Sequence, residues 1–400
     1  MSPVEPPAEV GRSGEGVRIF LSAGDPSGDV HGALLADAIR RLLPGAWMYG
    51  ICGRQMTRAG VAQVADSTRF SGIGIAASVP KIPGLVALYA VLKGLLRATP
   101  PSLAILIDFP AFNMRVLSFA KSIGLPTLYW FPPASWKREP SKAARRVAAL
   151  ATRVATPFEW SARIMGELGG QAEWVGHPVL DRYEGRPSEA RARGMLAIPL
   201  PVTPVAVLPG SRPQEIRYIL PLLLRACREA EKSVPAILPV VSCGPSADRT
   251  ELRGTVDRFW PGAIITEDTV TLLSACRAAL TKSGTITLDA AACGLPMVAT
   301  YAGSWLDWLQ YQLVVKGHFR FIAAPNILLD RLVVPECYEK RGTPDAIAAE
   351  LVRLLEDGRE REDCKAGLAE ACALLGEPGS AERTARIAVQ MLEQRHPSTA

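Results

Sequence analysis

Residues 282–300 constrain the fold more than any other stretch of the chain, because they read as a turn, a helix and a strand in immediate succession. Thr285–Cys293 suits a helix, Gly294 stands where a helix C′ glycine belongs, and Pro296 prevents the helix from continuing. The apolar run Met297–Thr300 then reads as a buried strand. A helix followed this closely by a buried strand is typical of an α/β fold.

The turn that opens this helix consists of Ser283, Gly284 and Thr285. Such a turn offers backbone N–H groups and hydroxyls to an anion, and the helix dipole adds to the attraction. Asp289 follows one helical turn after Thr285, on the same face, where a carboxylate suits sugar hydroxyls beside a phosphate. We therefore expect the nucleotide of an activated sugar here; the alternative is an ordinary N-capped helix of an α/β domain.

Strand–loop–helix units fill the rest of the chain as well, which places it in the α/β class. Val17–Ala23 is a β-rich run before a glycine-bearing loop and a helix, and Val205–Leu208 opens a second series. Since 400 residues are too many for one typical core, we expect two Rossmann-like domains facing each other across a cleft, with C-terminal helices packing at their junction. The expected parts are a disordered tail (1–16), an N-terminal domain (17–180), a linker (181–203), a C-terminal domain (204–343) and C-terminal helices (344–400). Whether these helices return to the N-terminal domain is left open.

Composition excludes several functional classes. A net charge of +6 fits acidic substrates or an anionic membrane surface better than nucleic acid. The eight cysteines form no Cys-X-X-Cys motif and read as reduced thiols of a cytosolic protein, and four histidines make a multi-histidine metal site improbable. The loop Gly24–Asp29 is neither a dinucleotide-binding nor a Walker motif, so we expect no cofactor and no metal.

The run from Ile82 to Leu96 is almost entirely apolar and has Lys81, Lys93 and Arg97 around it. It is too short and too interrupted to span a bilayer. One interpretation is an interfacial element that contacts lipid; the other is a buried core helix. The residues expected to contact the membrane are Leu85, Val86, Leu88, Tyr89, Leu92, Leu95 and Leu96.

Transfer of a sugar from a nucleotide leaves a diphosphate with added negative charge. The chain contains no Asp-X-Asp motif that could hold a metal to stabilise this charge. A helix N-terminus and an arginine are the alternative means of stabilising it, and Arg212 follows the strand Val205–Leu208. Asp108 lies just past the strand Ser102–Ile107, where it would serve as general base or as an ordinary helix N-cap. Asp25 is the competing base. A single carboxylate acting as base implies inversion at the anomeric carbon.

Together these segments resemble the lipid-A-disaccharide synthase family, inverting glycosyltransferases of the GT-B type with two Rossmann-like domains. The resemblance covers about residues 17–392 and rests on pieces in a fixed order: Gly24–Asp29, Ile107–Asn113, Gly176–Pro178, Leu208–Ile216, Ser283–Leu288, Pro325–Asn326, and Leu375–Gly376 with Ala381–Arg383. Each piece alone is weak, but their order along the chain is specific.

The resemblance implies UDP-2,3-diacylglucosamine as donor and 2,3-diacylglucosamine 1-phosphate as acceptor, giving a β-1′,6-linked disaccharide phosphate and UDP. The resemblance favours Asp108 as the general base and implies that Arg212 is needed for activity. The residues alone leave Asp25 open as an alternative base. The residues it implies around the UDP-sugar are Gly210, Ser211, Arg212, Glu215, Ser283, Gly284, Thr285, Asp289 and Asn326. Those it implies on the acceptor side and its loops are Ser27, Gly28, Asp29, Asn113 and His177, the last of which is structural more often than catalytic in such a context.

The resemblance also implies a cytoplasmic protein attached peripherally to the inner face of the bacterial inner membrane, with no nucleic-acid partner and with a homodimer left open. Residues 130–137 depart from the family pattern. Two alternatives therefore stay open: another UDP-sugar enzyme, such as a different glycosyltransferase or a UDP-GlcNAc 2-epimerase, and a non-catalytic relative.

Overall fold

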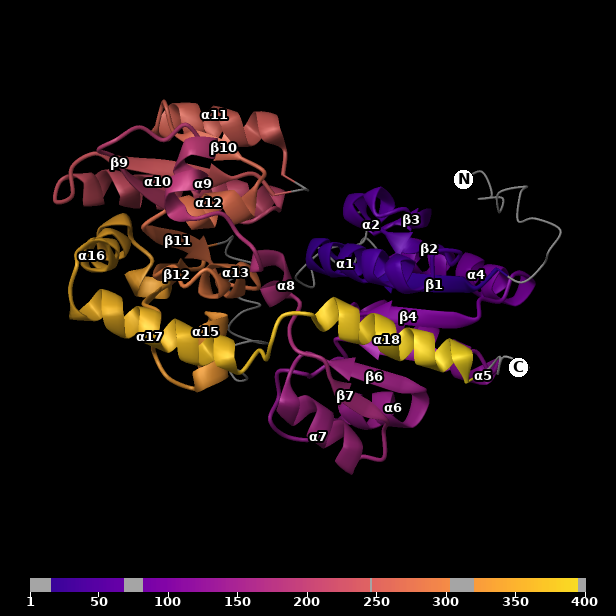
Figure 1. Cartoon of the computed structure of the whole chain (residues 1–400). Helices are drawn as coiled ribbons and strands as arrows, with labels where there is room; N and C mark the ends of the chain where they lie inside the picture. Colours follow the sequence, from indigo (N-terminus) through magenta and orange to yellow (C-terminus); the bar gives the residue numbers. More distant parts are fainter. Residues whose placement is uncertain (1–15, 68–81, 245–246, 303–319, 395–400) are drawn as a thin grey trace. The chain divides into compact units, whose positions relative to one another are not determined.

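The protein is described by a computed structural model that covers residues 16–67, 82–244, 247–302 and 320–394 (Figure 1). It divides into two compact units. Unit 1 comprises residues 1–181 and 375–400, and unit 2 comprises residues 182–374. The chain therefore crosses from unit 1 to unit 2 within the predicted linker, and returns to unit 1 at Leu375.

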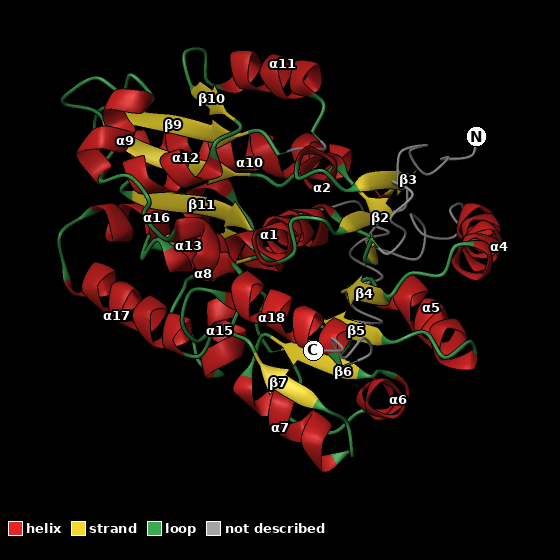
Figure 2. Ribbon diagram, turned by 45° about the vertical axis from the view of Figure 1, so that its right-hand side comes forward, coloured by secondary structure: helices red, strands yellow, loops and turns green. Residues whose placement is uncertain are grey.

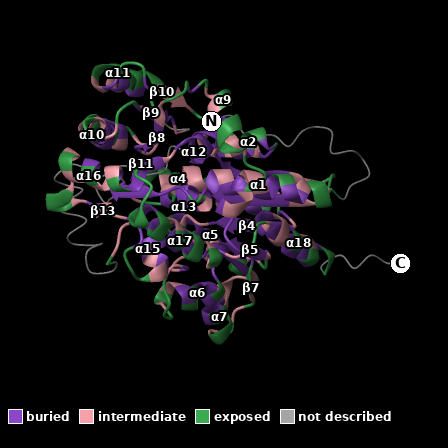
Figure 3. Ribbon diagram, turned by 60° about the vertical axis from the view of Figure 1, so that its left-hand side comes forward, coloured by how far each residue is buried: buried purple, intermediate pink, exposed green. Residues whose placement is uncertain are grey.

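Unit 1 is built on a parallel sheet whose described strands lie in the order β3-β2-β1-β4-β5-β6-β7. The strands are β1 (Arg18–Ala23), β2 (Trp47–Cys52), β3 (Ala62–Asp66), β4 (Leu103–Ile107), β5 (Thr127–Trp130), β6 (Arg153–Thr156) and β7 (Ala172–Trp174). Near-continuous apolar strands such as β4 are buried on both faces, as in parallel sheets covered by helices on each side. Figure 3 shows how strongly burial concentrates in the strands.

Helices cover both faces of this sheet (Figure 2). They are α1 (Pro26–Leu42), α2 (Arg54–Arg58), α4 (Ile82–Ala98), α5 (Pro110–Ser122), α6 (Lys142–Leu150), α7 (Glu159–Glu167), α8 (Val179–Tyr183), which continues into unit 2, and α18 (Ser380–Glu393). Alternating side chains of β1 enter different cores: Ile19 and Leu21 pack with α1 and α18, whereas Phe20 packs with α4 and α5.

Unit 2 contains a second parallel sheet, in the order β10-β9-β8-β11-β12-β13 among the described strands. The strands are β8 (Thr203–Leu208), β9 (Ile237–Ser242), β10 (Ile264–Thr266), β11 (Ala278–Lys282), β12 (Met297–Thr300) and β13 (Glu336–Cys337). The helices are α9 (Glu189–Met195), α10 (Pro213–Glu231), α11 (Arg249–Phe259), α12 (Thr269–Ala275), α13 (Ile286–Ala292), α15 (Ala324–Leu329), α16 (Pro344–Leu355) and α17 (Arg359–Ala373). Helix α10 packs against α11 and α16, whereas α13 packs against α15 and α17.

Both sheets follow doubly wound topology, which confirms the predicted α/β class with two Rossmann-like domains. In each sheet the strand order reverses once, between β1 and β4 in unit 1 and between β8 and β11 in unit 2. Successive right-handed crossovers then leave the helices on opposite faces, and a crevice opens at the carboxyl ends of the two central strands. These two points are where ligands bind in such sheets.

Helix α4 corrects part of the membrane prediction. Leu88, Leu92 and Leu96 are 5%, 1% and 0% exposed, because they recur every four residues on the face that packs into the core of unit 1. For these three residues the predicted contact with lipid is wrong. Val86 is 57% exposed. Within the described parts of the chain, no helix is both long and apolar enough to cross a membrane.

Candidate active site

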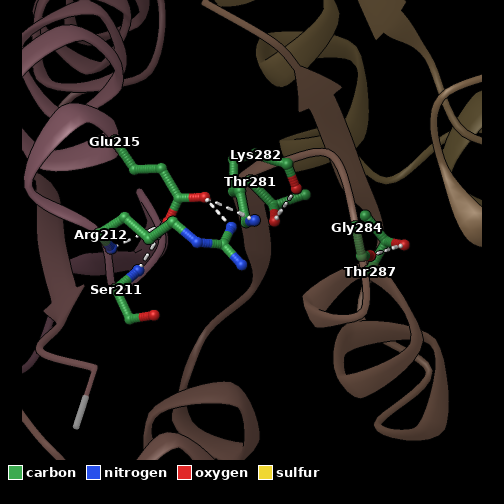
Figure 4. A network of polar contacts seen from close by, with 7 residues as sticks. All are labelled: Ser211, Arg212, Glu215, Thr281, Lys282, Gly284 and Thr287. Carbon is green, nitrogen blue, oxygen red and sulfur yellow. Dashed lines mark hydrogen bonds and ion pairs between the residues drawn. The ribbon is translucent and has the colours of Figure 1, made fainter. Parts of the chain in front are cut away.

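The switch point of unit 2 brings two predicted segments together. Strands β8 and β11 are hydrogen-bonded neighbours, with Leu208 paired to Thr281, so the loops that follow them leave the same edge of the sheet. The first loop carries Gly210, Ser211 and Arg212 into α10, and the second runs from Lys282 through the Ser283–Thr285 turn into α13. Figure 4 shows the side chains of the two loops facing one another.

Glu215 joins the two loops. Its Oε1 accepts hydrogen bonds from Arg212 Nη1 at 2.9 Å and from Lys282 Nζ at 2.8 Å. Its Oε2 accepts from the backbone N–H groups of Ser211 at 2.8 Å and Arg212 at 3.0 Å, which closes the first turn of α10. Burial alone would raise the pKa of Glu215, but Lys282 and Arg212 outweigh it and hold the pKa below its usual value.

The surroundings of Glu215 leave positive charge in excess. Two cations share one carboxylate, and the Nε of Arg212 is buried without a hydrogen-bond partner among the described residues. Gly210 has φ 106°, and a Cβ there would lie 2.1 Å from Glu215 Oε2, so only glycine lets the carboxylate reach this loop. The arrangement suits an anion that is more highly charged than one carboxylate.

The Ser283–Thr285 turn lies directly after Lys282. Ser283 N–H donates to Thr300 O at 2.8 Å, and the Thr287 hydroxyl donates to Gly284 O at 2.7 Å, so the turn is fixed to β12 and to α13. Gly284 has φ 119°, which favours glycine. Within the described chain, the N–H groups of Gly284 and Thr285 donate to no protein acceptor. They remain available to a ligand.

Asp289, predicted to contact sugar hydroxyls, is 3% exposed and lies on α13. Its Oδ1 accepts from Arg182 Nη1 at 2.5 Å and from the hydroxyl of Tyr183 at 2.9 Å. The carboxylate therefore anchors the chain where it enters unit 2. Contact of Asp289 with a sugar stays a prediction. Its hydrogen bonds favour a structural role, in which it ties α13 to the segment that carries Arg182 and Tyr183.

Asn326, predicted to lie near UDP, is fully buried at the start of α15. Its Nδ2 donates to Val334 O and to Glu336 Oε1, both at 2.8 Å, and its Oδ1 accepts from the N–H groups of Val333 and Val334. All of its hydrogen-bonding capacity is used inside unit 2. Its contact with UDP also stays a prediction, and the hydrogen bonds indicate a role in positioning the loop before β13.

In unit 1 the switch point places Asp25 after β1 and Asp108 after β4. Asp108 and the following Phe109 both have positive φ, 45° and 50°, so the chain turns sharply before α5. The hydroxyl of Tyr129 and the Nδ2 of Asn113 donate to the backbone oxygen of Asp108 at 3.0 and 2.9 Å. Strain at a position held by two side chains is typical of functional sites.

The environment of Asp108 suits a general base. Burial and the nearby charge of Asp25 raise the pKa of Asp108 to about 7, against a smaller opposing effect of a backbone hydrogen bond at Phe109. A carboxyl group with this pKa can accept a proton from an alcohol near neutral pH and release it again. Asp108 as a whole is half-buried.

The remaining loop residues of unit 1 have structural partners. Asp25 is the N-cap of α1 and accepts from Gly28 N–H at 2.6 Å. Asp29 accepts from three backbone N–H groups at the start of α2, those of Gly53, Gln55 and Met56. A Cβ at Gly28 would lie 2.9 Å from Asp25 Oδ1, so the glycine allows this cap. Ser27 lies half-buried in the same turn of α1.

Two further predicted residues of unit 1 are buried. Asn113 Oδ1 accepts from the hydroxyl of Ser22 at 2.6 Å, so this side chain ties the end of β1 to the Asp108 turn. His177 is 2% exposed, its Nδ1 accepts from Val179 N–H at 3.1 Å, and its ring packs edge-on against Phe131. Burial lowers the pKa of His177 to about 3, so the ring is neutral at physiological pH.

Sequence reasoning missed two groups of this site. Lys282 stood in the singled-out stretch but was given no role, although a lysine at the end of a strand beside an anion-binding turn is itself a sign of phosphate binding. Tyr129 carried no sequence signal, because its link to Asp108 depends on the register of β4 and β5. In the described chain, no cluster of three or more His, Cys, Asp or Glu side chains could hold a metal.

Comparison with known proteins identifies close relatives by sequence. A family model described as lipid-A-disaccharide synthetase matches residues 19–390. A lipid-A-disaccharide synthase of Anaeromyxobacter dehalogenans is 34% identical over 370 residues, which cover 92% of this chain and 96% of the relative. Another, from Geobacter metallireducens, is 33% identical over 382 residues, covering 94% and 98%.

Solved structures show the same architecture at much lower sequence identity. The co-structure of S. aureus MnaA with UDP matches with a TM-score of 0.62 and 11% identity, covering 96% of this chain and 98% of that one. The calicheamicin glycosyltransferase CalG4 matches with a TM-score of 0.57 and 16% identity, covering 96% and 99%. At these identities the likeness establishes the fold, in agreement with the two Rossmann-like units.

Proposed function

Because this chain belongs to the lipid-A-disaccharide synthetase family, we propose that it transfers 2,3-diacylglucosamine from UDP-2,3-diacylglucosamine to 2,3-diacylglucosamine 1-phosphate. The chain is a glycosyltransferase that binds a UDP-sugar. The products would be the β-1′,6-linked disaccharide 1-phosphate and UDP. The observation that carries the proposal is the pair of cations, Arg212 and Lys282, held by Glu215 beside the Ser283–Thr285 turn.

The leaving group accounts for the cations. As the bond between C1 of the donor sugar and the diphosphate oxygen breaks, the electron pair moves to UDP and its negative charge rises. Preorganised positive groups stabilise that charge more in the transition state than in the ground state, and this lowers the barrier. In this proposal Arg212 and Lys282 contact the diphosphate, and the N–H groups of Gly284 and Thr285 complete the site.

The acceptor needs a base. The 6-hydroxyl of the acceptor would attack C1 of the donor from the face opposite UDP, and its proton would pass to Asp108. A pKa near 7 supports this role, because the group is substantially ionised at neutral pH and is basic enough to take the proton. One displacement with one base inverts the anomeric carbon. Asp25 would act through Asp108 by raising its pKa.

The other predicted ligand residues stay part of the proposal in supporting roles. Asn326 and Asp289 would hold the loops around the UDP-sugar, and Asn113 would hold Asp108. The acyl chains of both substrates suggest action at the inner face of the inner membrane. The outward side of α4 supports this, since Val86 and Val91 are 57% and 53% exposed there.

The test is direct. The purified protein is incubated with both diacylated sugars in detergent micelles, and the products are separated by mass spectrometry. We expect disaccharide 1-phosphate and UDP in equal amounts, with no added metal. Release of UDP without disaccharide, or conversion of a UDP-sugar to its 2-epimer, would contradict the proposed transfer.

A further inference from the structure

Unit 2 has a concave region away from the Glu215 network, a groove of about 750 Å³ formed by the outer sides of α10 and α11 and by the start of α16. Helices α10 and α11 lie side by side (Figure 1). The groove residues used below are Arg217, Tyr218 and Arg225 of α10, and Glu251, Arg258 and Phe259 of α11. None of them belongs to the Glu215 network. We call this region the arginine groove.

Three arginines and one carboxylate are among the described residues that line the arginine groove, so the groove carries a net positive charge. Arg217, Arg225 and Arg258 are exposed, and none lies within ion-pair distance of a carboxylate in the described chain. Among the described residues that line the groove, Glu251 is the one acidic residue. Outside the groove, two arginines of the same helices have carboxylate partners: Arg228 pairs with Glu231 at 3.0 Å, and Arg249 pairs with Glu267 at 2.9 Å.

Aromatic rings lie beside these guanidinium groups. The guanidinium carbons of Arg225 and Arg258 lie 5.0 and 5.4 Å from the centroid of the Phe259 ring, and that of Arg217 lies 5.9 Å from the Tyr218 ring. A guanidinium beside an aromatic ring gains a cation–π attraction, and it can still present paired N–H donors to a phosphate. The groove is therefore prepared for phosphate groups.

We propose that the arginine groove binds the headgroups of anionic phospholipids and docks unit 2 on the bilayer. The cations come from two helices along an open groove, which suits several headgroups at a surface better than one enclosed phosphate. Tyr218 is 40% exposed beside them, and tyrosine favours the membrane interface. The inference deepens the proposed function, since lipid substrates are drawn from a bilayer, and it adds a contact on unit 2 to that expected of α4.

The test uses the full-length protein and co-sedimentation with vesicles. One set of vesicles contains equal parts of phosphatidylglycerol and phosphatidylcholine, and the other contains phosphatidylcholine alone. Each of Arg217→Gln, Arg225→Gln and Arg258→Gln should weaken binding to the anionic vesicles about fivefold, and the triple variant about a hundredfold, because each arginine near such a surface contributes a similar increment. Binding to the neutral vesicles should not change.

The matched control is Arg253→Gln, which removes an exposed arginine of α11 that does not line the groove. It should bind anionic vesicles almost as the unchanged protein does. Thermal unfolding of all variants checks that the fold is retained, and turnover in detergent micelles should equal that of the unchanged protein, because the groove is separate from the Glu215 network.

Two results would overturn the inference. If the triple variant binds anionic vesicles like the unchanged protein, α4 or another surface carries the attachment. If millimolar inorganic phosphate releases the protein from vesicles at constant ionic strength, the groove is a site for free phosphate. Failure of the proposed function is distinguishable: it would appear as absence of disaccharide in detergent, whatever the vesicles show.

Discussion

Glu215 sets the geometry of the candidate site at the scale of single residues. Its side chain is 13% exposed and accepts hydrogen bonds from two backbone N–H groups and two cationic side chains. Both carboxylate oxygens therefore already have partners within the protein. We therefore propose that Glu215 holds Arg212 and Lys282 at a fixed separation; its predicted contact with the UDP-sugar stays a prediction. Such a residue preorganises charge before the substrate arrives.

Glu215→Gln should therefore weaken both the fold and the site. The amide offers weaker acceptors and places an N–H beside two cations, which we expect to cost about 1–3 kcal/mol of unfolding free energy. Thermal or denaturant unfolding measures this loss, and the KM for the UDP-sugar should rise at the same time. An unchanged midpoint of unfolding would mean that the network contributes nothing to stability.

Asp108 gives a prediction of pH dependence. In the proposed mechanism its ionised form is the base, so kcat/KM should rise as the pH increases through about 7. Asp25→Asn removes a charge that raises the pKa of Asp108, and the midpoint of this limb should move to lower pH. The pH dependence of kcat/KM, measured in detergent for the unchanged protein and for Asp25→Asn, tests this prediction. Retained turnover in Asp108→Asn with loss in Asp25→Asn would instead assign the base to Asp25.

The sequence indicated which residues come together better than it indicated what each of them contacts. Arg212 and the 283–285 turn were expected to lie together, and the neighbouring strands β8 and β11 do bring their loops together. The tasks of Asp29, Asn113 and Asn326 were not visible, because each depends on partners remote in sequence or on backbone groups whose orientation only the fold sets. Polar residues in a motif can support the site as readily as they contact a substrate.

At the scale of elements, α4 shows how an apolar run can be misread. Its overall hydropathy suggested lipid contact, but the four-residue spacing of Leu88, Leu92 and Leu96 marks one buried face. That spacing was present in the sequence and would have separated the core side from the outward side. The exposed side is narrower and is represented by Val86 and Val91.

Two substitutions in α4 should therefore have opposite effects. Leu92→Ala should destabilise the protein by about 2–5 kcal/mol, since it opens a cavity in a closed core. Val86→Ser should leave the unfolding free energy within about 0.5 kcal/mol, while weakening attachment to vesicles. Denaturant unfolding and co-sedimentation distinguish the two. Equal destabilisation by both variants would mean that the outward side of α4 is also packed.

At the scale of the whole molecule, the two sheets share a strand order, and each places its candidate groups at the point where that order reverses. The sequence predicted this, because repeated strand–loop–helix units and the position of loops at strand ends suffice for it. The family resemblance and the glycosyltransferase activity it implied are confirmed. The structure adds that α16 and α17 belong to unit 2, whereas α18 belongs to unit 1.

Helix α18 is consequently part of the core of unit 1 despite its distance in sequence. Ala385, Ala388 and Met391 pack with Ile19 and residues of α1. A chain ending at Leu374 should lose more than about 5 kcal/mol of stability, because burial of each large apolar side chain contributes about 1.5–3 kcal/mol. Calorimetry of the truncated chain tests this. A melting profile like that of the full chain would contradict it.

The central claim is that cations at the switch point of unit 2 stabilise the departing UDP, and the rate of Arg212→Ala tests it most directly. Turnover is measured in detergent with saturating substrates, beside Arg228→Ala, which removes an arginine of the same helix that pairs with Glu231. We predict that kcat falls about a hundredfold to a thousandfold in Arg212→Ala, with the control unchanged and both proteins folded. An Arg212→Ala enzyme that turns over at the full rate would contradict the account.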